Sequence, residues 1–130
     1  MDLIEITLKH LRKHPLFKPE HRVLTREISG GWWIGYRTTG SNHPQETTHF
    51  DVNILKDTFF VLHIAVEKEE RGKGHGDALY KVLEEIARET KCKKVQMTAS
   101  GQTPSGESRQ DYLLRRGYKK FGIEVVKEFS

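Results

Sequence analysis

The sequence contains very little cysteine. Cys92 is the only one among 130 residues, which excludes an internal disulfide and a four-cysteine metal site. It also lacks any apolar run of roughly eighteen residues, the length that a membrane-spanning helix needs, and its N-terminus is too charged for a signal peptide. These absences predict a cytoplasmic protein in a reducing compartment, with no membrane partner and no bound metal.

The charge balance is only mildly basic, with 22 Lys and Arg residues against 18 Asp and Glu residues and a net charge of +4. This balance favours a ligand that carries phosphate. Acidic residues are interspersed among the basic ones and no aromatic-basic RNA motif is present, so a nucleic-acid-binding module is a less favoured alternative. The length predicts a single domain over residues 1–130.

The first half of the chain predicts a short helix followed by strands. Asp2 and Glu5 form a capping-box pair, and the helix that they begin must end before Pro15. Runs rich in β-branched and aromatic residues, separated by turn residues, then predict an antiparallel meander. These runs are HRVLTREIS (21–29), WWIGYRTT (32–39) and HFDVNIL (49–55). The next run, TFFVLHIAV (58–66), is apolar at nearly every position and predicts a central strand buried on both faces.

The second half alternates between helix and strand. A helix is predicted after Gly76, because its apolar residues recur at helical spacing. The strand KKVQMTAS (93–100) follows it, so the strands before and after this helix should be parallel and close together. A further helix is predicted over SGESRQDYLLRRG (105–117), and closing strands over YKKFGIEVVKEF (118–129). The pattern predicts an α/β domain with a mixed, mostly antiparallel sheet.

Three glycines, Gly72, Gly74 and Gly76, stand directly before the central helix. A helix N-terminus carries unpaired N–H groups and a positive dipole end, and glycine lets a phosphate approach them closely. A Walker loop is excluded because Gly74 follows Lys73 where Ser or Thr is required, and the glycine spacing is not that of a dinucleotide fingerprint. The loop therefore predicts an anion site of another kind, with glycine-rich turn geometry alone as the alternative.

The pattern R-x-x-G-x-G is filled by Arg71, Gly74 and Gly76 between a buried strand and a helix, and LLRRGY follows downstream. Over residues 59–118 the chain resembles the GNAT superfamily of acyl-CoA-dependent N-acyltransferases. The resemblance implies a splayed parallel strand pair at the coenzyme A site, and transfer of acetyl from acetyl-CoA, or of another acyl group, to a primary amine. It also implies that the loop holds the pyrophosphate and that the strand end pairs with the pantetheine arm. The implied cofactor-binding residues are Ile64, Ala65, Val66, Arg71, Gly72, Lys73, Gly74, His75, Gly76 and Asp77.

The catalytic groups depart from the pattern that the resemblance implies. With Gly117 and Tyr118 aligned to its Gly-aromatic pair, Leu113 stands where a tyrosine usually protonates the thiolate. Tyr112 comes one residue early, which on a helix is a rotation of about 100° away from the thiol. We therefore expect Tyr112 to be a packing residue, with proton donation as the alternative.

Two residues are candidates for the general base. His63 can titrate near neutral pH, although a core histidine is the favoured interpretation, and Glu67 follows the same strand. Family members that carry a base on this strand place it at positions matching Phe60 or Leu62, which strict alternation would put on the face opposite His63.

Other functions remain as alternatives to the enzyme. The unusual position of Tyr112 is compatible with a GNAT-like protein that binds acyl-CoA without catalysis. The chain also reaches its central strand early, so the N-terminal part, which shapes the acceptor side in the family, is abbreviated. Both a monomer and a homodimer are compatible with the sequence.

Overall fold

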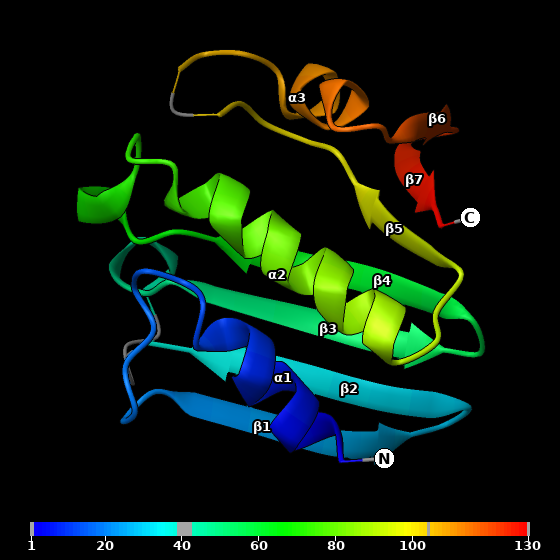
Figure 1. The fold of residues 1–130 in the computed structure, drawn as a ribbon. Helices are drawn as coiled ribbons and strands as arrows, with labels where there is room; N and C mark the ends of the chain where they lie inside the picture. The colour runs from blue at the N-terminus through cyan, green and yellow to red at the C-terminus, as the bar shows by residue number, and fades with distance from the viewer. Residues whose placement is uncertain (1, 39–42, 104, 130) are drawn as a thin grey trace.

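The computed structural model describes residues 2–38, 43–103 and 105–129. They form one seven-stranded sheet in the order β1-β2-β3-β4-β5-β7-β6 (Figure 1). The strands are β1 (Arg22–Ile28), β2 (Gly31–Arg37), β3 (His49–Leu55), β4 (Thr58–Ala65), β5 (Lys94–Thr98), β6 (Lys119–Phe121) and β7 (Glu124–Glu128). Residue 39, the predicted end of the second strand, lies outside the described residues.

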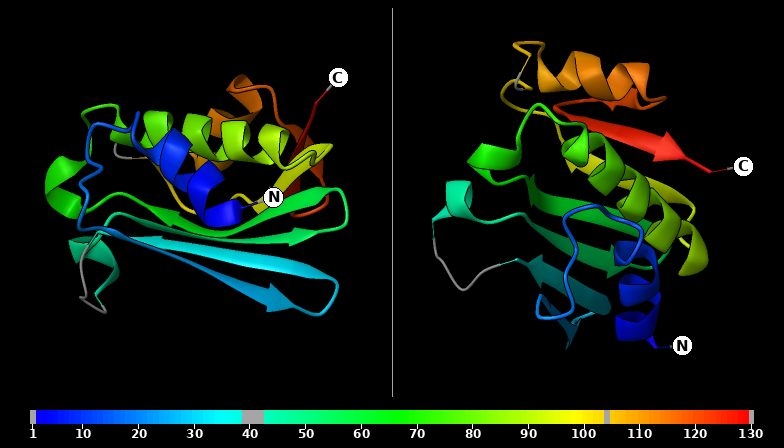
Figure 2. Two further views of the ribbon diagram at one scale, coloured as in Figure 1. Left: turned by 60° about the horizontal axis from the view of Figure 1, so that its bottom comes forward. Right: turned by 60° about the vertical axis from the view of Figure 1, so that its left-hand side comes forward.

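Three α-helices, α1 (Leu3–Leu11), α2 (His75–Glu89) and α3 (Arg109–Arg115), accompany the sheet, with short 3-10 turns η1 (Pro44–Glu46) and η2 (Lys68–Glu70). Figure 2 shows α1 and α2 side by side on one face of the sheet. The Asp2 carboxylate accepts the N–H groups of Ile4 and Glu5 (3.0 and 3.2 Å), so α1 begins at its predicted cap. It ends at Leu11, before Pro15.

The strand pairing confirms the mixed sheet. Strands β1 to β4 form the antiparallel meander, and β4 pairs in parallel with β5 across α2. The parallel ladder covers only residues 58–61 of β4 and 94–97 of β5, after which the strands diverge (Figure 1). The edge strand β1 follows α1 and joins β2 in a hairpin. The central strands therefore open into a fork at their C-terminal ends.

The structure corrects our account of β4. The register shifts between Asp51 and Val52, so that Val52 pairs with Val61 whereas Asp51 pairs with His63. The extra residue, Leu62, is a β-bulge and is 49% exposed. Because paired residues share a face, the bulge puts His63 on the same side as Phe60, not on the opposite side. The strand is thus not buried on both faces along its whole length, because Leu62 and His63 are exposed, and His63 is not a core histidine.

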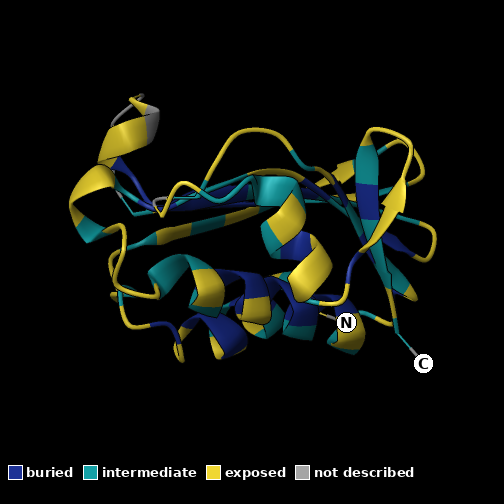
Figure 3. Ribbon diagram, turned by 90° about the horizontal axis from the view of Figure 1, so that it is seen from above, coloured by how far each residue is buried: buried dark blue, intermediate teal, exposed yellow. Residues whose placement is uncertain are grey.

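The core lies between the helices and the inner face of the sheet, where buried segments of α2 and of the strands face each other (Figure 3). Its largest fully buried side chains are Tyr36, Phe50, Phe59, Leu11, Ile34, Leu79, Leu83, Ile86, Leu113, Val52, Val95 and Val125. Cys92 is also buried. The predicted helix over residues 105–117 is shorter than expected, because Ser108 caps it by accepting the Asp111 N–H (3.1 Å).

Candidate functional site

The glycine loop ends in a left-handed residue that begins α2. Gly74 is the N-cap, with φ 84° and ψ 1°, a conformation that disfavours any residue with a Cβ. The first helical hydrogen bond runs from the Ala78 N–H to the Gly74 carbonyl (3.2 Å). Within the described part of the chain, the backbone N–H groups of residues 72–77 have no acceptor. The loop therefore presents a row of unpaired donors at the positive end of a helix.

Side chains hold this loop in place from two directions. The Arg71 Nε donates to the Val66 carbonyl (2.8 Å), which ties the loop to the end of β4. The His14 ring accepts the Leu16 N–H at Nδ1 and donates from Nε2 to the His75 carbonyl (2.9 Å). Burial lowers the pKa of His14, which favours this neutral form. The segment after α1 is thereby bound to the first residue of α2.

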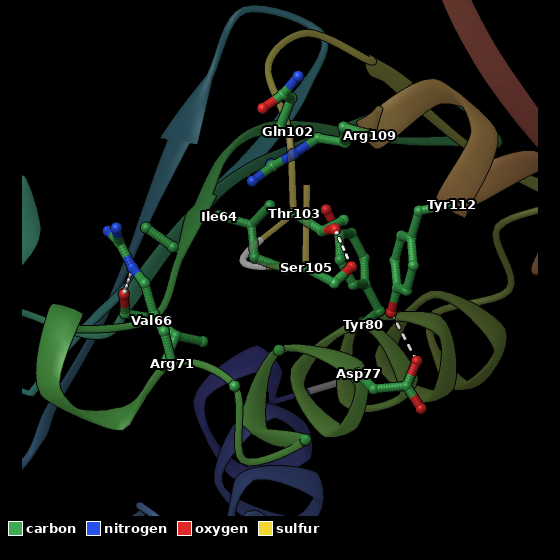
Figure 4. Close-up of a pocket in the computed structure, with 14 residues that line it drawn as sticks. Ile64, Val66, Arg71, Asp77, Tyr80, Gln102, Thr103, Ser105, Arg109 and Tyr112 are labelled. Atoms are coloured by element: carbon green, nitrogen blue, oxygen red, sulfur yellow. Dashed lines mark hydrogen bonds between the residues drawn. The ribbon is translucent and has the colours of Figure 1, made fainter. Parts of the chain in front are cut away.

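A cleft of about 640 Å³ opens beside the loop, between the diverging ends of β4 and β5 (Figure 4). The last residues of β4, Ile64 and Ala65, form one wall together with Val66, and the loop glycines close one end. Because the ladder with β5 stops at Val61, residues 62–65 have no strand partner on this side within the described sheet. Their main-chain donors and acceptors on that edge can bind another extended chain.

The opposite wall is built by the segment between β5 and α3. Thr103 donates its N–H to the Glu107 carbonyl (2.8 Å), and Arg109 donates its N–H to the Gly101 carbonyl (2.9 Å), so the segment folds back on itself. Gln102, Thr103, Ser105 and Arg109 line the cleft from this side (Figure 4). Arg109 has no ion-pair partner among the described residues, so its guanidinium can bind an anion in the cleft.

Helix α3 meets α2 at the mouth of the cleft. The Tyr112 hydroxyl donates to the Asp77 carboxylate (2.5 Å), and Arg116 donates to the same oxygen (2.6 Å). The Tyr112 hydrogen bond, with help from Arg116, lowers the pKa of Asp77. Burial, and then the same hydrogen bond to Asp77, raises the pKa of Tyr112. Because its pKa is raised and its proton is already donated to Asp77, Tyr112 is a poor acid in this arrangement.

A buried carboxylate fixes the position of α3. Glu84, 5% exposed, accepts hydrogen bonds from the Tyr118 hydroxyl (2.9 Å), Arg116 (3.2 Å) and Lys127 (3.5 Å). These partners come from the end of α3, the residues just after it and β7, so the network joins them to α2. The network sets the rotation of α3, which brings Tyr112 to Asp77 and buries Leu113 completely.

Most of the predicted cofactor-binding residues come together at the cleft. Its lining includes Ile64, Ala65, Val66, Arg71, Gly72, Gly74, Gly76 and Asp77. Lys73 and His75 are not part of the lining, and both lie 3.4 Å from the Glu70 carboxylate. Of the three catalytic candidates, Tyr112 lines the cleft, whereas His63 and Glu67 do not.

The two base candidates lie beyond the cleft wall. His63 shares the outer sheet face with Asp51, its partner on β3. Glu67 accepts the Thr48 hydroxyl (3.2 Å), and its own N–H donates to the same Thr48 oxygen (3.1 Å). Thr48 therefore orients Glu67 at the beginning of η2.

Sequence reasoning missed five residues that line the cleft: Tyr80, Gln102, Thr103, Ser105 and Arg109. For Tyr80 and Arg109, the spacing along the helix was a signal that could have placed them near the site. Tyr80 follows Asp77 by one helical turn, and Arg109 follows the Ser108 cap at the first position of α3. Gln102 and Thr103 carried none, because no helix or strand was predicted there, and Ser105 was expected inside a helix.

A sequence model described as the acetyltransferase (GNAT) family matches residues 8–122. This chain belongs to the GNAT acetyltransferase family. The seven-stranded, mostly antiparallel sheet with its single parallel pair, β4 and β5, is the GNAT fold that the resemblance predicted.

Solved GNAT structures share the fold at low sequence identity. The PaiA N-acetyltransferase from Thermoplasma acidophilum, in complex with coenzyme A, is 14% identical with a TM-score of 0.52; the match covers 75% of this chain and 60% of that one. The IAA acetyltransferase from Bacillus cereus is 14% identical with a TM-score of 0.57, over 83% of this chain and 100% of that one. Tetrahymena GCN5 is 11% identical with a TM-score of 0.55, and the match covers 98% of this chain and 86% of that one.

No curated protein sequence matches this GNAT chain. None of the helices in the described residues has the length and apolar character required to cross a bilayer. No group of three or more metal-ligating side chains occurs among the described residues.

Proposed function

We propose that this protein is an acyl-CoA-dependent N-acyltransferase, a single domain over residues 1–130, that transfers acetyl from acetyl-CoA to a primary amine. The observation that carries the proposal is the row of unpaired N–H groups at residues 72–77, at one end of a cleft of about 640 Å³. The fold that it shares with a coenzyme A complex, PaiA, supports the same ligand. The single buried cysteine fits a cytoplasmic location.

The loop fits a pyrophosphate. Its N–H groups are unpaired, the α2 dipole is positive there, and a methyl built on Gly72 or Gly74 would meet no atom within 4 Å, so the approach is open. Arg109 adds a cation on the facing wall. Residues 72, 74 and 76 would therefore hold the pyrophosphate by main-chain contacts, and Arg109 would add positive charge to the cleft.

The free edge of β4 fits the pantetheine arm. The arm contains amide groups, and an amide can pair with the unpartnered main chain at Ile64 and Ala65 as a strand would. Acyl-CoA supplies the acyl group as an activated thioester. The neutral amine of the acceptor attacks the thioester carbonyl, the C–N bond forms and the C–S bond breaks. The nitrogen loses one proton as it becomes an amide, and the departing thiolate takes up one proton, so the step is balanced.

Coenzyme A should raise the melting temperature, because a ligand that binds only the folded state stabilises it by about 2.7 kcal/mol at a hundredfold excess over its Kd. Arg109→Gln should reduce this shift. Arg115→Gln is the matched control, since Arg115 lies on the same helix but pairs with Glu107 outside the cleft. An absent shift in the wild type at millimolar coenzyme A would refute the proposal.

Thiol release measured with acetyl-CoA and a panel of primary amines separates the enzyme from a protein that only binds acyl-CoA. The burial of Leu113 at the usual acid position favours testing this second function. Release that depends on an amine supports the transferase, whereas binding without release from any amine supports the non-catalytic alternative.

A further inference from the structure

Tyr80 carries a buried hydroxyl that lacks a hydrogen bond. Its side chain lines the cleft and is 6% exposed. Among the described residues, no donor or acceptor contacts its oxygen, and it is the only cleft-lining residue with such a buried side-chain atom. A buried hydroxyl without a partner costs folding free energy. The position therefore retains a group that the fold itself does not use.

Tyr112, which lies next to Tyr80, has no free proton to donate to a ligand in the cleft. The two rings are 5.6 Å apart between centroids and stand together on the α2–α3 side of the cleft (Figure 4). A phenol has one proton to donate, and that of Tyr112 already goes to Asp77 (2.5 Å). Of the two tyrosines that line the described part of the cleft, only Tyr80 has a hydroxyl without a hydrogen-bond partner, and that hydroxyl is buried at the cleft wall.

Tyr118 is a buried tyrosine whose hydroxyl has a structural role, which makes it a useful comparison for Tyr80. It is also buried, at 3% exposed, but its hydroxyl donates to Glu84 (2.9 Å). A phenylalanine at position 80 would keep the ring contacts with Tyr112 and with Arg116, whose guanidinium lies 5.6 Å from the Tyr80 ring centroid. Packing thus accounts for the ring of Tyr80 but not for its hydroxyl.

The place of Tyr80 along α2 indicates which part of a ligand it meets. It lies four residues beyond Gly76, about 6 Å along the helix axis, and on the same face as Asp77. This is past the end of the cleft that fits the pyrophosphate, in the part that faces the free edge of β4. In the acyl-CoA complex proposed above, the group in this part would be the pantetheine arm, whose amide carbonyls accept hydrogen bonds.

We propose that the Tyr80 hydroxyl donates a hydrogen bond to an amide carbonyl of the pantetheine arm, an assignment that rests on the acyl-CoA function proposed above. Tyr80 would then hold the arm from the α2 side while the main chain of β4 holds it from the other. The hydroxyl is a binding group, and it obtains its partner only in the complex.

The test compares Tyr80→Phe with Tyr118→Phe, the same change at the two buried tyrosines. Coenzyme A affinity is measured by calorimetry, and the melting temperature is measured without ligand. Tyr80→Phe should melt at the same temperature as the wild type or higher, and should bind coenzyme A roughly three- to tenfold more weakly. Tyr118→Phe should melt at a lower temperature than the wild type, because its hydroxyl bonds to the buried Glu84.

An unchanged coenzyme A affinity in Tyr80→Phe would overturn the assignment while leaving the proposed function intact. A lower melting temperature of unliganded Tyr80→Phe would also overturn it, because the hydroxyl would then have a structural partner. If the wild type itself fails to bind coenzyme A, the proposed function fails first, and this outcome is visible before any variant is made.

Discussion

Gly74→Val should abolish coenzyme A binding while leaving the protein folded. At φ 84° a residue with a Cβ is strained by about 1–2 kcal/mol, and a β-branched residue by more. At roughly 4 °C per kcal/mol for a domain of this size, the unliganded variant should melt about 4–8 °C lower. If the loop relaxes or the side chain blocks the pyrophosphate, each lost charge-assisted hydrogen bond costs about 1.5–3 kcal/mol, or roughly ten- to a hundredfold in Kd.

Gly76→Ala is the matched control for this experiment. Gly76 is not among the residues with positive φ, and a Cβ built there meets only a Val66 methyl at 3.8 Å, an ordinary contact. It should keep both its stability and most of its affinity. The assay is a thermal shift titration followed by calorimetry on each folded variant. A folded Gly74→Val protein with wild-type affinity would place the ligand outside the glycine loop.

Two further predictions concern side chains around the loop. Tyr112→Phe should lower turnover by less than about tenfold in thiol-release assays, because its proton is held by Asp77; a much larger fall with intact binding would restore it as the acid. Burial lowers the pKa of His14, so its contribution to stability should be present above about pH 6.5 and be lost as the pH falls toward the folded pKa. His14→Gln should therefore flatten the decline in melting temperature between about pH 7 and 5, and an unchanged slope would contradict this origin.

Sequence patterns predicted the strands well because each is a run rich in β-branched, aromatic or other apolar residues that is bounded by turn residues. The first helix, the β3 bounds and the parallel pairing of β4 and β5 all follow from local signals. The bulge at Leu62 could not be predicted, because it depends on how β4 pairs with Asp51 on another strand. The extra residue changed the face of His63, and Leu62 and His63 are the exposed residues of a strand that was expected to be buried on both faces.

The site was predictable where it depends on the main chain and not where it depends on helix placement. The glycines before α2 indicated the loop directly. The orientation of Tyr112 follows from the rotation of α3, which is set by Glu84 and its partners on other elements. Tyr80 and Arg109 could be placed on their helices from the sequence, but that α2 and α3 meet at the cleft is a long-range relation that local spacing does not reveal.

The fork between β4 and β5 affects which substitutions the chain can accept at this edge of the sheet. An exposed strand edge normally invites aggregation, but here the edge at residues 62–65 is enclosed by the facing wall of the cleft. A ligand that pairs with that edge uses peptide groups, which every amino acid except proline supplies in full. Substitutions along the fork that retain the peptide N–H would thus leave such main-chain contacts in place.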